Sequence, residues 1–329
     1  MSGLKIKSRP AGAIFIGEPF NNERGIALLL TLVVLVLLTA VIVEFDYGAK
    51  VNLITAGNFR DEIQATYLAK AGATAARAAL KDDIKQAAGS NYDGLDELWA
   101  QPVSLPVGEG FVSGEITDEG GKIDVNRLGM KDTPGNPISG DTQEMLKRLL
   151  SILEVESNQI DPTVEAIKNW VDPDDARDCV EDSHYQRLDP PYRCKKAPMD
   201  TLSELLLVKG VTPEIYRKVR PYVTTVSMQN QPININTADL PVLRVALGEA
   251  EVLSEETAMC IKDGRPYKTV VFGCGYDCPV GSRCRRLISF RSSYFTVKSH
   301  GIMHETERIA TAMIKRDGTK TSFISWQIE

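Results

Sequence analysis

The sequence predicts an α+β fold: a long N-terminal transmembrane and amphipathic α-helix, an antiparallel β-sheet domain and a large helical insertion domain. Residues 26–43 form an apolar run without a charge, and no proline interrupts the chain from there to about residue 81. Alternating apolar residues indicate strands at 111–128 and near the C-terminus, where Asp317-Gly318 is the expected turn of a meander. Between these two regions, apolar residues three and four positions apart indicate helices.

The apolar run 26–43 has the length of a membrane span. At 1.5 Å per residue its eighteen residues extend for about 27 Å, close to the thickness of a hydrocarbon core. The charges that set its orientation are Lys5, Lys7, Arg9 and Arg24 before it and Glu44 and Asp46 after it. Because basic residues stay on the cytoplasmic side, the N-terminus is predicted to be cytoplasmic and the rest of the chain to lie across the membrane.

The remaining elements are predicted from turn and cap residues. Residues 111–128 are expected to form a hairpin around Gly120-Gly121. Asp141 is the expected cap of a helix over 142–153, and Pro162 the first-turn residue of a helix that ends at Trp170.

An acidic loop after this helix is a candidate metal site. Seven carboxylates lie between residues 172 and 189, and a hard cation such as Ca²⁺, which prefers oxygen ligands, would neutralise their repulsion. The candidate ligands are Asp172, Asp174, Asp175, Glu181 and Asp182. The loop does not have the EF-hand pattern. The alternative interpretation is a solvated acidic loop without a metal.

All six cysteines follow the membrane segment, which favours disulfides in an oxidising compartment. Joining Cys179 to Cys194 would hold the acidic loop closed and stabilise the fold by roughly 3 kcal/mol. The other four cysteines, Cys260, Cys274, Cys278 and Cys284, allow three pairings, which the sequence leaves open. A zinc site is the competing interpretation of these four, and their spacing fits it poorly.

The N-terminus resembles that of type IV pilins and type II secretion pseudopilins, because Arg24-Gly25 precedes "IALLLTLVVLVLLTAVIVEF". The resemblance implies that a prepilin peptidase cuts after Gly25 and methylates Ile26. Most members carry a glutamate where this chain has Leu30. That departure, with "NWVDPDD", "LDPPYR", "SELLLVKGV" and "ININTA" in this order, resembles the minor pseudopilin K family of the general secretion pathway, which is known for calcium in its helical domain.

The resemblance implies a division of the chain and a role. The expected parts are a leader at 1–25, a transmembrane segment at 26–43, a periplasmic stem at 44–82, a pilin-like β part at 83–135, a helical insertion domain with the acidic loop at 136–255, and a cysteine-rich loop and β-meander completing the pilin-like domain at 256–329. The implied role is a structural tip subunit of the periplasmic pseudopilus, anchored in the inner membrane. The implied partners are the I- and J-type minor pseudopilins, the major pseudopilin, the prepilin peptidase, the inner-membrane secretion platform, and an exoprotein or the secretin.

Two other functions remain open from the sequence. Residues 205–219 resemble a helix-hairpin-helix, which suits a membrane-anchored DNA-uptake protein; its turn, Lys209-Gly210-Val211-Thr212, lacks the second glycine of a phosphate grip. A net charge of −6 also argues against a nucleic-acid partner. A signal-anchored periplasmic calcium protein is the third hypothesis. No set of residues predicts a catalytic site, so we expect no enzyme activity.

Overall fold

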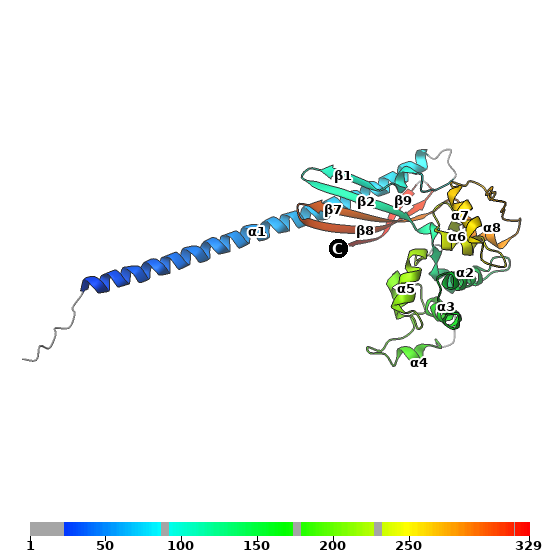
Figure 1. The fold of residues 1–329 in the computed structure, drawn as a ribbon, viewed down its shortest axis with the longest axis horizontal. Helices are drawn as coiled ribbons and strands as arrows, with labels where there is room; N and C mark the ends of the chain where they lie inside the picture. The colour runs from blue at the N-terminus through cyan, green and yellow to red at the C-terminus, as the bar shows by residue number, and fades with distance from the viewer. Residues whose placement is uncertain (1–22, 87–91, 174–178, 227–231, 319) are drawn as a thin grey trace, which may run out of the picture. The chain divides into compact units, whose positions relative to one another are not determined.

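The fold contains a five-stranded antiparallel sheet with a helix packed on it (Figure 1). The computed structural model describes residues 23–86, 92–173, 179–226, 232–318 and 320–329. Helix α1 runs from Glu23 to Gln86. The chain divides into a unit that ends at Arg60 and a second from Asp61 to Glu329, so the part of α1 on the sheet belongs to the second unit.

The sheet has the strand order β1-β2-β7-β8-β9. Its strands are β1 (Val103–Val107), β2 (Gly110–Asp118), β7 (Tyr294–Met303), β8 (Thr306–Asp317) and β9 (Lys320–Ile328). Gly318 has a positive φ of 53°, as a tight turn between β8 and β9 requires. The predicted α+β class and the C-terminal meander are therefore confirmed, whereas β1 lies in a segment where no strand was predicted.

Helix α1 approaches the sheet closely because its buried positions carry small residues. Ala65, Ala69 and Ala73, four positions apart, are fully buried. Opposite them, a Cβ on Gly301 of β7 would overlap the carbonyl oxygen of Ala65 and the amide nitrogen of Ala69. The core between helix and sheet consists of Ala73, Leu80, Trp99, Phe295, Val297, Ala312 and Ile314.

We predict that Gly301→Ala separates helix from sheet and lowers the free energy of unfolding by roughly 1–3 kcal/mol, because the atoms that it meets are backbone and cannot rotate away. Denaturant unfolding of the full chain in detergent measures the effect. Gly57→Ala is the control, since its new Cβ has nothing within 4 Å. Equal unfolding midpoints for wild type and Gly301→Ala would contradict the prediction.

A helical domain is inserted between the neighbouring strands β2 and β7 (Figure 1). Its α-helices are α2 (Ile138–Ile152), α3 (Ser157–Val171), α4 (Asp182–Tyr185), α5 (Pro213–Val219), α6 (Leu240–Leu247), α7 (Glu255–Asp263) and α8 (Arg283–Leu287). Two short parallel pairs, β3 (Ile123–Asp124) with β4 (Val223–Thr224) and β5 (Ile233–Asn234) with β6 (Ile288–Ser289), complete it. Asp118 pairs with Phe295, so the insertion leaves and re-enters the sheet at one point.

The predicted hairpin at 111–128 is wrong. Gly120 and Gly121 lie in a 3₁₀ turn, and the strand after it, β3, pairs with β4 a hundred residues away. The physical reason is burial, because Ile123 belongs to the core of the insertion and is 1% exposed. That core extends from Ile123 to Ile288, wider than the predicted limits of 136 and 255.

Two helix starts also differ from prediction. Helix α2 begins at Ile138 because the carboxylate of Asp132 accepts the free N–H of Ser139 at 2.7 Å, which leaves Asp141 inside the helix. Helix α3 begins at Ser157, so Pro162 lies within it and not in its first turn. Helix α5 is capped by Thr212, whose hydroxyl accepts the N–H of Ile215 at 3.2 Å.

Candidate functional sites

The first candidate site is the apolar part of α1, whose side chains face solvent. The described segment Gly25–Asp83 contains a window with a mean hydropathy of 3.3, none of it buried by protein. Its two hydroxyls, on Thr31 and Thr39, donate to carbonyls of the preceding turn at 2.8 and 2.7 Å. Such a surface can be covered by lipid or by other apolar helices.

The predicted processing residues lie at the start of this helix. Gly25 and Ile26 are both helical, and the Ile26 side chain is 71% exposed. Leu30, at the position where the related pilins carry a glutamate, is also exposed. Residues 1–22 of the predicted leader lie outside the described residues.

The second candidate site is the acidic loop that follows α3. Asp172 is the C-cap of α3, and its N–H donates to the carbonyl of Lys168 at 2.9 Å. Asp174 and Asp175 lie outside the described residues. Glu181 and Asp182 are described at the start of α4, so three of the five predicted ligands have a known place.

A disulfide between Cys179 and Cys194 joins the two ends of this loop. Asp182 strengthens the closure, because its Oδ1 accepts the N–H of Cys194 at 2.8 Å. Trp170 at the end of α3 packs edge-on against Tyr185 and Tyr192. Burial raises the pKa of the Tyr185 hydroxyl to about 12, so this ring stays neutral beside the carboxylates.

The Glu181 carboxylate is the best candidate ligand of the described residues. It is 8% exposed, and the Asn169 amide donates to its two oxygens at 3.2 and 3.4 Å, while the disulfide-bonded sulfur of Cys179 lies 3.4 Å away without a hydrogen to donate. None of these contacts neutralises its charge, and a buried carboxylate is costly without a cation. Its oxygen donors fit the preference of Ca²⁺.

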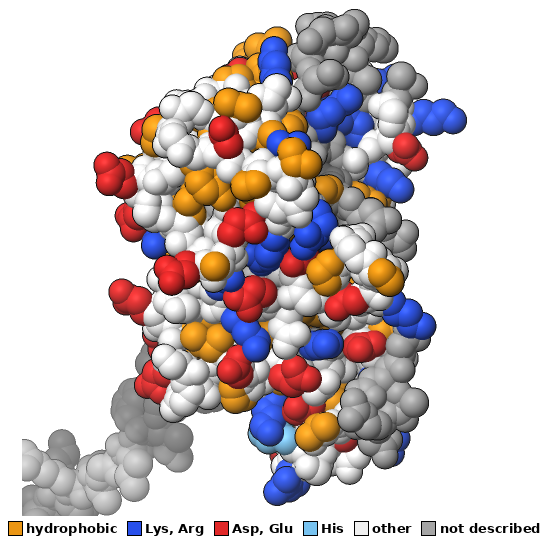
Figure 2. All heavy atoms as spheres, turned by 90° about the vertical axis from the view of Figure 1, so that its right-hand side faces the viewer, with side chains coloured by type: hydrophobic (Ala, Val, Ile, Leu, Met, Phe, Trp, Pro, Cys, Tyr) orange, Lys and Arg blue, Asp and Glu red, His pale blue; other side chains and the backbone are white. Residues whose placement is uncertain are grey.

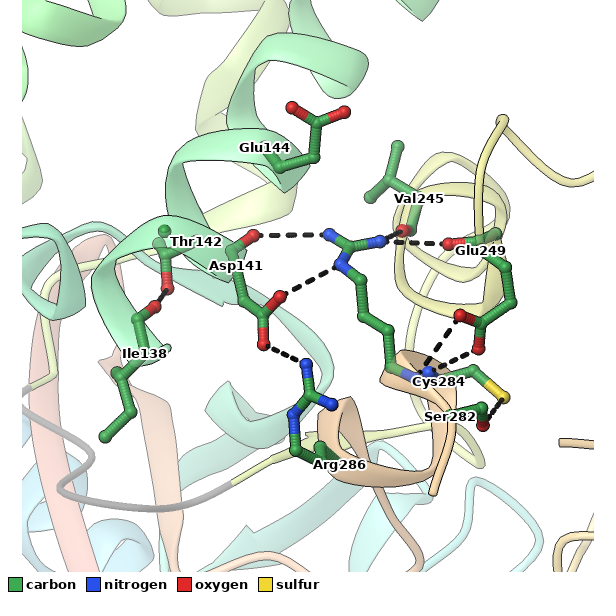
Figure 3. Close-up of polar contacts among 12 residues, drawn as sticks. Ile138, Asp141, Thr142, Glu144, Val245, Glu249, Ser282, Cys284 and Arg286 are labelled. Carbon is green, nitrogen blue, oxygen red and sulfur yellow. Dashed lines mark hydrogen bonds and ion pairs between the residues drawn. The ribbon is translucent and has the colours of Figure 1, made fainter. Parts of the chain in front are cut away.

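The remaining cysteines form two disulfides, Cys260–Cys274 and Cys278–Cys284, which resolves the pairing that the sequence left open. Around the second disulfide, arginines of α8 meet Asp141 of α2 (Figure 3). Arg283 Nε lies 3.1 Å from Asp141 and Arg286 Nη2 lies 3.0 Å from it. Burial lowers the pKa of Arg283. These contacts fix the cysteine-rich loop on the helical insertion.

A buried polar network joins the insertion to the sheet, and its partners were not predicted from the sequence. Asp118, at the end of β2, accepts from Gly120, Asn234, Thr237 and Ser292 at 2.5–3.0 Å. Burial raises the pKa of Asp118, and these four hydrogen bonds offset part of that rise. The "ININTA" segment therefore acts as a clamp, with Asn234 and Thr237 as its contacts.

Arg316 of β8 extends the network to the stem helix. It is 5% exposed and forms ion pairs with Asp83 of α1, at 3.0 Å, and with Asp93. It also donates to the Ser292 carbonyl at 2.9 Å, and Asp93 in turn accepts the Ser292 N–H at 2.6 Å. Burial raises the pKa of Asp83, and the Arg316 charge opposes that rise. One cation thus holds the helix, the loop before β1 and the end of the insertion together.

An exposed apolar helix that continues onto an antiparallel sheet defines a membrane-anchored subunit of the pilin-like class, here enlarged by the insertion between β2 and β7. The family model described as "Type II secretion system (T2SS), protein K" matches residues 121–228. Type II secretion system protein K of Aeromonas hydrophila is 30% identical over 228 residues, 66% of this chain and 68% of the relative. The chain belongs to the type II secretion system protein K family.

Two further comparisons cover more of the chain. Type II secretion system protein K of Pectobacterium carotovorum subsp. carotovorum is 25% identical over 320 residues, 93% of this chain and 97% of that protein. The crystal structure of the GspK-GspI-GspJ complex from the enterotoxigenic Escherichia coli type 2 secretion system contains a chain with a TM-score of 0.70 and 21% identity. The match covers 84% of this chain and 99% of that one. The fold of the two chains is therefore the same.

The turn of the helix-hairpin-helix-like segment does not support the DNA-uptake hypothesis. Its first element, Leu202–Leu207, is a 3₁₀-helix, and a Cβ on Gly210 would lie 2.8 Å from the Thr163 hydroxyl of α3. The turn therefore packs against protein. On the face of the insertion in Figure 2, basic and acidic side chains are interspersed, and the comparisons point to secretion.

Proposed function

We propose that this chain is the tip subunit of the periplasmic pseudopilus, which it caps or initiates during export of folded proteins. Its N-terminus is cytoplasmic, its stem crosses the inner membrane once, and its two folded parts are periplasmic. The observation that carries this proposal is the insertion of a whole helical domain between the adjacent strands β2 and β7. An apolar stem can pack against sister stems, while so large an addition occupies space that a next subunit would need.

Partners follow from the same proposal. The solved relative is named in a complex with GspI and GspJ, so the I- and J-type minor pseudopilins are the first partners, followed by the major pseudopilin. The apolar surface of α1 is the proposed contact between stems. The remaining proposed partners are the prepilin peptidase, the inner-membrane platform, and an exoprotein or the secretin. The role is structural and needs no catalysis.

Processing of the N-terminus tests the assignment to a fibre. We predict that cells with a prepilin peptidase yield a chain that begins at a methylated Ile26, because Gly25 ends the polar leader at the edge of the apolar helix. Mass spectrometry of the purified protein reads the new terminus. Gly25→Leu is expected to keep the leader, whereas the control Gly48→Ala is expected to be cut normally. An intact leader on the wild-type chain would contradict the proposal.

Calcium in the acidic loop is the proposed structural cofactor. Its proposed ligands are Asp172, Asp174, Asp175, Glu181 and Asp182. We predict that Ca²⁺ stabilises the full chain by about 2.7 kcal/mol at a hundredfold excess over its Kd, and that a chelator lowers the Tm accordingly. Glu181→Gln is expected to abolish the calcium-dependent shift, while Glu305→Gln, at an exposed turn, keeps it. A Tm that does not respond to the chelator would rule out the site.

A further inference from the structure

Strand β9 ends the sheet with an edge that has little protection. Its segment from Thr321 to Ile328 contains neither a charge nor a proline. Proteins commonly guard such edges with lysine, proline or a covering segment, because unpaired N–H and C=O groups bind other strands. The opposite edge strand, β1, carries Pro106. The feature of β9 that can disfavour pairing with another strand is a bulge in its middle, opposite Met313 and Ile314 of β8.

The backbone of β9 has donors and acceptors directed outward. Glu329 and Ile309 exchange both of their main-chain hydrogen bonds, at 2.9 and 3.0 Å. Because bonded and outward residues alternate in an antiparallel pair, Ile328 and Trp326 direct their N–H and C=O groups toward the open edge. A ligand that satisfies these groups must itself be an extended strand.

The side chains along this edge present apolar surface. Ile324 is 52% and Trp326 37% exposed. Phe323 packs edge-on against Trp326 with ring centroids 5.0 Å apart, and the guanidinium of Arg77 lies 4.7 Å from the Phe323 ring. The bulge supplies one extra residue, which keeps Phe323 and Trp326 in contact on one face.

A basic groove lies beside the edge, between the last turns of α1 and the β8–β9 hairpin. Its charged lining consists of Arg77, Lys81, Lys315 and Lys320, with Asp317 as the carboxylate of the lining. Four cations and one anion contrast with a chain whose net charge is −6. The groove therefore attracts a negatively charged ligand.

We propose that β9 accepts an extended segment of another subunit as an added strand. The part of that segment beside Phe323 and Trp326 is uncharged, and the part beside Lys320 is acidic. The preference for another protein over a second copy rests on the proposed function, in which one copy ends a fibre. The edge and the groove do not depend on it. This surface lies on the sheet and the last turns of α1, and its residues belong neither to the apolar segment 26–43 nor to the helical insertion.

Peptide probes test the proposal on the full chain in detergent micelles. The first probe alternates Thr and Val and ends in two glutamates, the second ends in two lysines, and the third is the first with N-methylated amides. We expect the first to bind and to slow amide exchange at Trp326 and Ile328. The lysine probe is expected to bind about tenfold more weakly at low salt, since it meets like charges. The N-methylated probe should not bind, because it cannot form the ladder.

Matched variants separate the backbone from the side chain. Ile328→Pro removes an outward donor and should weaken binding of the glutamate probe at least about tenfold, whereas Ile328→Val keeps the donor and should bind normally. Lys320→Ser should weaken binding of the glutamate probe without weakening that of the lysine probe.

Absence of protection at Trp326 and Ile328, equal affinity of the glutamate and lysine probes, or unchanged binding by Ile328→Pro would overturn the proposal. So would dimerisation of the free chain through this edge, because a second copy would then be the occupant. Normal processing at Gly25 with no strand binding would reject this inference and leave the proposed function standing.

Discussion

Replacing Arg316 with methionine is expected to lower the free energy of unfolding by about 3–5 kcal/mol, because it leaves buried carboxylates without their cation. Arg316 is 5% exposed and ion-pairs with Asp83 and Asp93, of which Asp93 is itself 2% exposed. Methionine fills similar volume, so the loss reports charge and hydrogen bonding more than a cavity. The guanidinium also lies 4.8 Å from the Phe295 ring, and that contact disappears as well.

The pH dependence of this loss has a defined sign. Burial already raises the pKa of Asp83 above its ordinary value of 3.8 while Arg316 opposes the rise, so removal of Arg316 raises that pKa further. A carboxyl with a raised folded pKa adds stability that is fully present below the unfolded pKa and is lost as pH rises through the folded pKa. The difference between Arg316→Met and wild type should therefore be largest near neutral pH and shrink as pH falls toward 3.8.

Denaturant unfolding of the full chain in detergent at several pH values measures this difference. Arg217→Met is the matched control, with an expected change within about 0.5 kcal/mol, since Arg217 is exposed and its hydrogen bond among the described residues goes to the Pro213 carbonyl of its own helix. If Arg316→Met unfolds like the control, the network does not hold the sheet, the stem helix and the insertion together.

The elements that the sequence predicted well are those with local signals. An uncharged run such as 26–43 has few structural alternatives, and the C-terminal meander combines alternation with a glycine turn at Gly318. The hairpin at 111–128 had the same kind of signal and was wrong. Its second strand gains more by entering the core at Ile123 beside Val223 than by pairing with β2. Local alternation cannot distinguish these two partners, because it indicates which residues face a core and not which strand they pair with.

The candidate sites also contain some residues with a local signal in the sequence and others that only the fold brings together. Carboxylate density pointed to Glu181 and Asp182, which are adjacent in the chain, but not to Asn169, whose amide reaches Glu181 from the preceding helix. Asn234 and Thr237 belong to the "ININTA" motif, which was recognised in the sequence. Their partner Asp118 is more than a hundred residues away, so only the fold reveals the clamp. Disulfide pairing among four cysteines depends likewise on distances that spacing does not contain.

Under the proposed function, in which the helical insertion blocks the next subunit, its removal is expected to let the chain join the length of the fibre. Asp118 and Phe295 are paired across neighbouring strands, so an Asn-Gly turn in place of residues 119–294 would join them directly and close β2 and β7 into a hairpin in the same register. The core between α1 and the sheet, which includes Trp99, Val297 and Ile314, lies outside the deleted segment. The shortened chain therefore keeps the proposed packing surface of the stem and loses the domain proposed to exclude the next subunit.

The measurement is the position of the epitope-tagged chain on pseudopili assembled with the I-type, J-type and major pseudopilins. Full-length protein should label fibre ends, and the shortened chain should label their length and permit longer fibres. Leu30→Glu in the full-length chain is the control for the stem, because it restores the common residue while keeping the insertion; its label should stay at the ends. The reverse outcomes, a shortened and folded chain that still labels only ends or a full-length chain that polymerises alone into long filaments, would remove steric capping as the mechanism. Termination would then have to come from the stem, where Leu30 stands in place of the glutamate that most of the similar pilins carry.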